Sequence, residues 1–286
     1  MRKEIYMSVT IITGSTADLS KDVIDRLVVI PQMVHFGEKE YIDGVTMTSD
    51  EFYDYLQKTN VPPKSSHPSP QAYRDEYEKA IAKGDDIVVI TISSKLSGTL
   101  QSATLAAEGL DNVYVVDSKS ASIGEGILCE LALRLADEGK SAAEIAEIIT
   151  RERENIVLIG ALDTLEYLQR GGRISRTKAF VGALLSIKPL ITNKDGAVAT
   201  LGRARGSKKA YRLMIEEIKK IGGIDFQKPV LFAYSGRNDD KIKKFIEENN
   251  ELWGKELPNP EYVHMGSVIG THAGPGAVVV AFYKKV

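Results

Sequence analysis

Short hydrophobic runs alternate with amphipathic stretches along the first half of the chain. The hydrophobic runs are rich in Val and Ile and are bounded by turn residues, which is typical of buried strands. They are Val9–Ile12, Val28–Met33, Ile87–Ile92 and Val113–Val116. Helical patterns separate or follow them, at Ser49–Thr59, Pro70–Lys83, Leu100–Gly109, Ile123–Glu138 and Ser141–Glu154. This alternation predicts βαβ units and a largely parallel sheet.

The second half of the chain has a more mixed order of elements, which predicts a second α/β domain with some antiparallel pairing. Asp195-Gly196 lies between two short apolar runs, and this dipeptide favours a β-hairpin. The other expected strands are Val157–Ala161, Val230–Tyr234, Tyr262–Val268 and Ala277–Phe282. The expected helices are Leu165–Gln169, Lys178–Leu185, Ser207–Ile221 and Asp239–Glu248. We place the domain boundary near residue 155, so that the two domains span residues 1–155 and 156–286.

Composition and charge exclude several classes of protein. The chain has 286 residues, a length more typical of two domains than of one. It carries 37 Lys and Arg against 39 Asp and Glu, and this near-neutral balance argues against a nucleic-acid-binding protein. The single cysteine, Cys129, cannot form an internal disulfide, which favours a reducing, cytoplasmic setting.

One segment is long enough to cross a membrane, but its composition argues against this. Tyr262–Tyr283 contains no Asp, Glu, Lys or Arg, and about 20 apolar residues can span a bilayer. The same segment contains four glycines and a proline, which favour two short strands joined by a loop. We therefore expect no transmembrane segment.

Two segments rich in hydroxyl groups precede predicted helices. Ile92–Thr99 directly follows the most hydrophobic predicted strand, and the carboxyl ends of parallel strands form the ligand crevice of such sheets. A helix cap needs one hydroxyl, whereas this segment has four, so it favours an anion site at the helix N-terminus. In Ser65–Pro70, either Ser66 or Ser69 is expected to cap the following helix. The remaining hydroxyls are then expected to face a cleft and to bind an anion or a carboxylate.

Two clusters of cations lie beside predicted helices. Arg170–Lys178 holds four cations in nine residues, and it is either a solvated helix start or a surface for phosphate or an acidic partner. Arg203–Lys209 holds four cations in seven residues before a predicted helix. Lysine at a helix N-terminus opposes the helix dipole, so this second cluster favours a bound anion.

His272 lies in the glycine-rich segment Gly270–Gly276, which we expect to form a loop between two strands. Such a loop can approach a ligand closely, and the imidazole can donate a hydrogen bond to a carboxylate or a phosphate. No second His, Cys or carboxylate is spaced to complete a metal site with it. We therefore expect neither a metal nor another cofactor.

Taken together, these motifs resemble those of the DegV family of bacterial fatty-acid-binding proteins. The resemblance covers the whole chain, through Thr13–Leu19, Ser65–Pro70, Ile92–Thr99, Val116-Asp117-Ser118, Leu165–Ser175, Gly202–Ala210 and Gly270–Gly276. It implies an α/β fold of two domains, an N-terminal Rossmann-like parallel sheet and a C-terminal mixed α/β domain, with the ligand between them. The chain departs from the family pattern at Gly14, where the family usually has Asp, and at Ser65, where a serine replaces the usual threonine but keeps the hydroxyl.

The resemblance also implies a function and a set of site residues. The protein would bind a long-chain fatty acid such as palmitate and present its carboxylate to a separate, ATP-dependent fatty acid kinase, with no catalysis of its own. The hydroxyls of Ser65, Ser66 and Ser97 would hold the carboxylate, with His272 and Arg205 near the head group. Residues facing the head group or the kinase would be Arg173, Ser94 and Arg203.

Two other classes of function stay open from the residues alone. One is a hydrolase or transferase that uses a serine of Ser94–Ser97 together with His272. The other is a regulatory protein that binds a phosphorylated small molecule through Arg203–Lys209, and this class predicts a steep salt dependence of binding.

Overall fold

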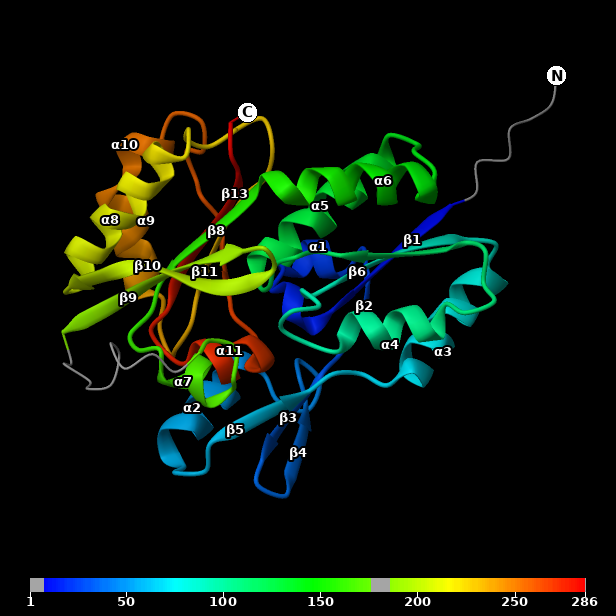
Figure 1. The fold of residues 1–286 in the computed structure, drawn as a ribbon, viewed down its shortest axis with the longest axis horizontal. Coiled ribbons are helices and arrows are strands. Elements are labelled where there is room, and N and C mark those ends of the chain that lie inside the picture. Colours follow the sequence, from blue (N-terminus) through cyan, green and yellow to red (C-terminus); the bar gives the residue numbers. More distant parts are fainter. Residues whose placement is uncertain (1–7, 176–185, 286) are drawn as a thin grey trace.

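The computed structural model describes residues 8–175 and 186–285 (Figure 1). Its first sheet has four parallel strands. The strand order is β2-β1-β6-β7, and each pairing is parallel. The strands are β1 (Val9–Gly14), β2 (Val28–Ile30), β6 (Asp86–Thr91) and β7 (Val113–Asp117). The two central strands are buried on both faces, which explains their continuous apolar runs. The predicted parallel sheet is therefore confirmed.

Helices cover both faces of this sheet. On one face, Tyr73 and Tyr77 of α3 (Pro70–Ala82) pack with α4 (Thr99–Ala106) against Ile12 and Val89. The other face is covered by α5 (Ile123–Asp137) and α6 (Ala142–Glu152), with α1 (Lys21–Ile24) at the edge. Two short 3-10 helices, η1 (Ser15–Ala17) and η2 (Arg153–Asn155), follow β1 and α6. Helix α5 also contacts strands of the large C-terminal sheet, so it lies between the two larger sheets (Figure 1).

One predicted strand is wrong, because its residues are divided between the parallel sheet and a small antiparallel sheet. The run Val28–Met33 is not one strand, because Pro31 has no N–H to donate to a sheet. The chain leaves the parallel sheet after Ile30 and begins the strand β3 (Met33–Phe36) in a second sheet, whose order is β4-β3-β5. Its other strands are β4 (Lys39–Ile42) and β5 (Pro63–Ser66), and α2 (Ser49–Lys58) packs on it through Phe52. Ser65 and Ser66 therefore lie on a strand.

The third sheet is mixed and has the strand order β10-β9-β8-β13-β11-β12. Its strands are β8 (Ile156–Ala161), β9 (Ile187–Lys194), β10 (Ala197–Arg205), β11 (Val230–Tyr234), β12 (Tyr262–His264) and β13 (Val278–Tyr283). Only β11 and β12 pair in parallel. The predicted hairpin is confirmed, since Asp195 and Gly196 both adopt positive φ between β9 and β10. One face of the sheet is covered by α8 (Ser207–Lys220), α9 (Asp240–Glu248) and α10 (Asn250–Trp253) (Figure 1).

The segment before β13 differs from its prediction. We expected a strand over Tyr262–Val268 and a loop over Gly270–Gly276, but β12 ends at His264 and a helix, α11 (Ser267–Ala273), follows. Gly270 lies within this helix, where a Cβ atom would come 2.6 Å from the Tyr53 hydroxyl. The glycine that suggested a loop thus permits close helix packing, and His272 lies on a helix.

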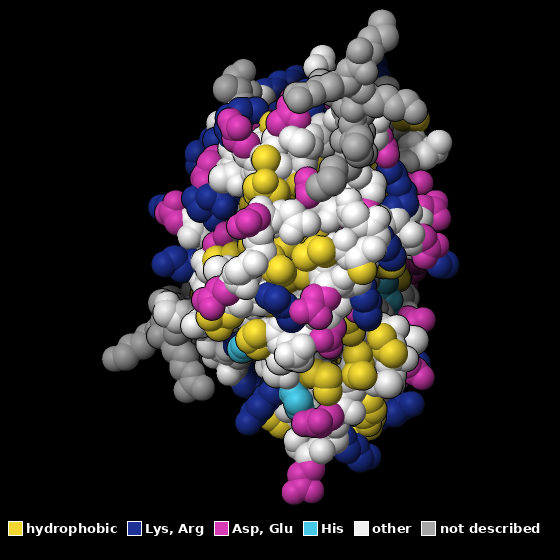
Figure 2. All heavy atoms as spheres, turned by 90° about the vertical axis from the view of Figure 1, so that its right-hand side faces the viewer, with side chains coloured by type: hydrophobic (Ala, Val, Ile, Leu, Met, Phe, Trp, Pro, Cys, Tyr) yellow, Lys and Arg dark blue, Asp and Glu magenta, His cyan; other side chains and the backbone are white. Residues whose placement is uncertain are grey.

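Some predictions fall outside these observations. The predicted helix Lys178–Leu185 lies outside the described residues, as does Arg176. The boundary near residue 155 stays a prediction, although every strand of the mixed sheet follows it. No helix among the described residues combines the length and apolar character that a membrane crossing requires. Figure 2 shows cationic and anionic side chains interspersed over one face of the molecule, in keeping with the near-neutral net charge.

Candidate functional site

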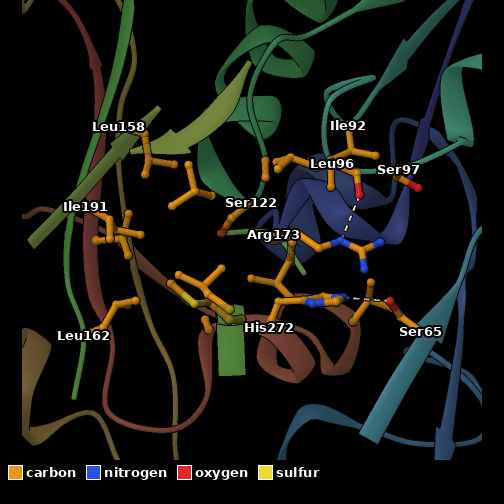
Figure 3. Close-up of a pocket in the computed structure, with 18 of the residues that line it drawn as sticks. Ser65, Ile92, Leu96, Ser97, Ser122, Leu158, Leu162, Arg173, Ile191 and His272 are labelled. Carbon is orange, nitrogen blue, oxygen red and sulfur yellow. Dashed lines mark hydrogen bonds between the residues drawn. The ribbon is translucent and has the colours of Figure 1, made fainter. Parts of the chain in front are cut away.

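An apolar cavity lies where the two larger sheets and α11 meet (Figure 3). It holds about 750 Å³ of empty space, a figure that includes space open to solvent. Its apolar lining comes from both halves of the chain and consists of Ile92, Leu96, Leu158, Leu162, Leu168, Ile191, Val198, Met265, Val268, Ile269 and Val279. Ser65, Ser97, Arg173 and His272 gather on one side, opposite Leu158, Leu162 and Ile191 (Figure 3). The cavity therefore has a polar end and an apolar end.

The first contact at the polar end joins Ser65 of β5 to His272 of α11. The Ser65 Oγ and His272 Nε2 atoms are 2.8 Å apart, although the residues are 207 positions apart in sequence. Burial and the nearby charge of Arg173 lower the pKa of His272 to about 4, so its imidazole is neutral at physiological pH. A Cβ atom on Gly171 would lie 2.3 Å from His272 Nδ1, so the glycine leaves room for the ring.

The second contact involves Ser97, in the turn between β6 and α4 at the carboxyl edge of the parallel sheet. Ser97 Oγ lies 2.8 Å from Thr99 Oγ1. Gln32 Nε2 donates to Thr99 Oγ1 across 3.4 Å, and both Gln32 and Thr99 are buried. A chain of hydrogen bonds thus runs from Gln32 to the Ser97 hydroxyl. No motif in the sequence points to Gln32, because it stands alone between two apolar runs.

Arg173 provides the positive charge at this end. Its Nε donates to the Leu96 carbonyl at 3.0 Å, and one terminal nitrogen donates to the Gly171 carbonyl at 2.6 Å. Burial lowers the pKa of Arg173, but a guanidinium group remains protonated at neutral pH. Two of its donors are used by the backbone, so the remaining N–H groups can serve an anion. Arg173 lies three residues after the end of α7 (Glu166–Arg170), so this helix positions it beside the cavity.

Ser66 and Ser94 do not line the cavity. Successive side chains of a strand point to opposite faces, so Ser66 points away from Ser65 and lies 2.9 Å from His35 Nε2. Ser94 is exposed and donates to Asp117 Oδ2 across 2.6 Å. Ser69 caps α3, because its hydroxyl oxygen accepts the backbone N–H of Ala72. This confirms one of the two caps that the sequence allowed, Ser66 or Ser69. Of the two neighbouring serines, Ser65 is the one that faces the cavity.

Arg203 and Arg205 also lie away from the cavity. Both are exposed on β10, and Arg205 lines a separate hollow with Lys208, Lys209 and Glu248. Val198, which does line the cavity, is seven residues earlier on the same strand. At about 3.3 Å per residue, the strand carries Arg205 roughly 20 Å further along. Among the described residues, no three His, Cys, Asp or Glu side chains gather as a metal site would need.

Comparisons with known proteins agree with one another. The family model described as "Uncharacterised protein, DegV family" matches residues 8–285. A DegV domain-containing protein of Caldanaerobacter subterraneus is 34% identical over 284 residues, which cover 97% of this chain and 99% of the relative.

Solved structures are also similar over nearly the whole chain. A structure that describes fatty acid binding by a DegV family protein from Thermus thermophilus has a TM-score of 0.87 and 34% identity, and covers 98% of this chain and 100% of that one. A stearic acid-binding protein from Eubacterium ventriosum has a TM-score of 0.83 and 26% identity, and covers 96% of this chain and 98% of that one.

Proposed function

The chain belongs to the DegV family, and from this we propose that it binds one long-chain fatty acid, such as palmitate, in the cavity and presents the carboxylate to a separate fatty acid kinase. The observation that carries the proposal is the division of the cavity into an apolar end and an end that bears two hydroxyls, an imidazole and a guanidinium. An extended amphiphile with one anionic group matches this division. The fatty acids named for the similar solved structures support it.

The tail of the ligand would supply most of the binding free energy. Burying about 14 methylenes at ~0.8 kcal/mol each gives roughly 11 kcal/mol of gross transfer free energy, much of it offset by the cost of association. The head group would contribute mainly to specificity, because an unpaired carboxylate in an apolar cavity is very costly.

The hydrogen bonds at the polar end suit a carboxylate. A serine hydroxyl has one donor, and it can accept other hydrogen bonds at the same time. The neutral His272 ring can donate its Nε2–H to Ser65 Oγ, which leaves the Ser65 hydroxyl free to donate to one carboxylate oxygen. Thr99 can donate to Ser97 Oγ in the same way, which frees the Ser97 hydroxyl for the other oxygen. Arg173 then balances the charge.

The kinase would transfer a phosphoryl group from ATP to a carboxylate oxygen, which gives an acyl phosphate and ADP. Arg173 borders the cavity and keeps free donors, so we assign it to the stabilisation of the acyl phosphate. Ser94, Arg203 and Arg205 are exposed outside the cavity, which supports a role toward the kinase over a role at the head group.

The geometry favours binding over hydrolysis. The serine that contacts His272 is Ser65, whereas the hydrolase alternative used Ser94–Ser97. In a hydrolytic triad a carboxylate orients the histidine through its second nitrogen. His272 Nδ1 has no hydrogen-bond partner in the part of the chain that the structure describes.

Calorimetric titration of the delipidated protein tests the proposed binding. We expect saturable binding of palmitate at one site per chain, weakened in Ser97→Ala without loss of the fold. Failure of a folded, delipidated protein to bind fatty acids of any chain length would falsify the proposal. Labelling of Ser65 or Ser97 by a fluorophosphonate probe would instead favour the hydrolase.

A further inference from the structure

Two buried carboxylates hold the first turn of α11. Asp18, which follows η1, accepts the backbone N–H of Gly266 at 2.7 Å. Asp43, which follows β4, accepts the backbone N–H of Ser267 at 2.9 Å and also accepts the Ser267 hydroxyl. The two aspartates are only 7% and 4% exposed, respectively. A carboxylate at a helix N-terminus is favourable, because it meets unpaired N–H groups and the positive end of the helix dipole.

Asp18 also reaches the wall of the cavity. Its second oxygen accepts the hydroxyl of Ser122 at 2.5 Å, and Ser122 lines the cavity. Ser122 has a φ of 55° and a ψ of −139°, a combination that is strained for a residue other than glycine. Asp18 therefore fixes two elements at once, the start of α5 and the start of α11.

Asp43 links α11 to the sheet that carries Ser65. Its backbone N–H donates to the carbonyl of Gln32 at 3.0 Å, so it is attached directly to a residue of the polar end. Ser65 lies on β5 of the same three-stranded sheet. Asp43 thus joins this sheet to the start of α11, and the hydrogen bond from Ser65 to His272 joins the same two elements again.

Helix α11 depends on such contacts for its position. It has only seven residues, too few for an independently stable helix. His272 lies five residues after Ser267 on this helix, and Ile269 and Ala273 line the cavity beside it. A small shift of its first turn would therefore move His272 relative to Ser65.

We propose that Asp43 and Asp18 are positioning residues for the fatty-acid head group: they fix α11 so that His272 can orient the Ser65 hydroxyl toward the carboxylate. This inference rests on the proposed function. It accounts for two carboxyl groups buried near the same turn of the chain, an arrangement whose desolvation cost is partly offset by their hydrogen bonds to Gly266 and Ser267.

The test compares palmitate with hexadecanol, which has the same chain length and no carboxylate. A variant that loosens the whole fold lowers the affinity for both ligands. A variant that misplaces the head-group residues lowers the affinity for palmitate selectively. We expect Asp43→Asn to lower the ratio of palmitate to hexadecanol affinity about fivefold, because the amide oxygen can keep both bonds from Ser267 but loses the charge that strengthens them. Ser267→Ala, which removes one of the bonds to Asp43, should lower the ratio about threefold.

Glu125→Gln is the matched control. Glu125 is a third fully buried carboxylate, but it accepts hydrogen bonds from Thr13 and Thr16 and makes none to α11. Its replacement should lower the melting temperature and leave the affinity ratio unchanged. An unchanged ratio in a folded Asp43→Asn protein and in Ser267→Ala would overturn the proposal. If Asp43→Asn does not fold, Ser267→Ala decides alone.

A second readout separates this inference from the proposed function. If the wild-type protein binds no fatty acid, the proposed function fails, but NMR titration of His272 still reports its position. The pKa of His272 is lowered by burial, so displacement of α11 in Asp43→Asn should raise this pKa toward its ordinary value. An unchanged His272 titration in Asp43→Asn and in Ser267→Ala would show that Asp43 does not position the ring.

Discussion

Two groups of polar residues in this molecule lie close to glycines, yet they differ in their surroundings. The polar end of the cavity holds its hydroxyls and imidazole inside the fold, close enough to bond one another. The cluster around Arg205 concentrates positive charge on the surface. Buried hydrogen bonds gain strength and direction from the low dielectric, whereas exposed charges are screened. The comparison shows that buried polar side chains within hydrogen-bonding distance of one another identify a candidate site better than a high density of exposed charge does.

The largest expected effect comes from removing both hydroxyls at the polar end. In Ser65→Ala/Ser97→Ala a buried carboxylate loses two donors, so palmitate affinity should fall about 100-fold. Calorimetric titration measures the loss. Ser66→Ala serves as the control, because Ser66 points to the other face of β5. This variant should bind palmitate with wild-type affinity. Equal palmitate affinities in the double variant and the control would show that Ser65 and Ser97 do not bind the carboxylate.

A smaller effect is expected when the histidine is displaced indirectly. Gly171→Ala places a methyl group 2.3 Å from His272 Nδ1, so the ring must shift from the position in which it meets Ser65. We expect about a tenfold loss of palmitate affinity, since one orienting hydrogen bond is lost. Gly172→Ala is a poor control, because Gly172 has a positive φ, but Gly202→Ala meets no neighbouring atom and should not change binding. Wild-type affinity in Gly171→Ala would contradict the importance of the ring's position.

Arg173→Ala separates binding from presentation. The tail supplies most of the binding free energy, so palmitate affinity should fall only about fivefold. Kinase-coupled turnover at saturating palmitate should fall by about a further tenfold, because the acyl phosphate loses its counter-charge. Arg170→Ala is the matched control, since Arg170 is exposed and pairs with Glu166. Equal losses in affinity and turnover would show that Arg173 has no separate role toward the phosphate.

The pH dependence of stability should contain two opposed contributions. The pKa of Asp18 is raised to about 7 by burial, so the folded state holds an extra proton and this contribution to stability is lost as pH rises from about 4 to 7. The pKa of His272 is lowered to about 4, so its contribution is lost as pH falls from about 6.5 to 4. Asp18→Asn and His272→Gln should therefore change the slope of melting temperature against pH in opposite directions, by about 10 °C over this window. Identical slopes in both variants would refute these assignments.

The smallest effect is expected from the exposed cluster. Arg205→Ala/Lys209→Ala should leave palmitate affinity within about twofold of the wild type, and high salt should change binding little, because screening is weak inside the cavity. Titration at low and high salt measures both. A steep salt dependence that disappears in this variant would favour a regulatory protein for a phosphorylated small molecule.

Local patterns predicted much of the fold and one segment of the candidate site. Ile92–Thr99 could be placed at the carboxyl edge of the parallel sheet from the order of elements alone, whereas Ser97 within it was implied by the family resemblance. The sequence could not decide whether Ser65 or Ser66 faces the cavity. That depends on the alternation of side chains along β5, and the sequence predicted no strand there. His272 was placed in a loop because Gly270 resembles a loop signal, whereas it serves packing against Tyr53.

The remaining features depend on contacts that sequence does not display. Asp18 and Asp43 meet Gly266 and Ser267 from more than 200 positions away, and no local pattern links them. The family resemblance implied a place near the head group for Arg205, and the cation cluster before a helix favoured a bound anion. The direction of β10, which carries it away from the cavity, is decided by pairing with β9.

The most direct test of the central claim is to denature the purified protein, extract it with solvent and identify the extract by mass spectrometry. The cavity's division into an apolar end and a polar end predicts a single class of long-chain fatty acid, near one per chain, and uptake of palmitate with a rise in melting temperature once the protein is delipidated. A folded protein that yields no fatty acid, and whose melting temperature no fatty acid raises, would contradict the account.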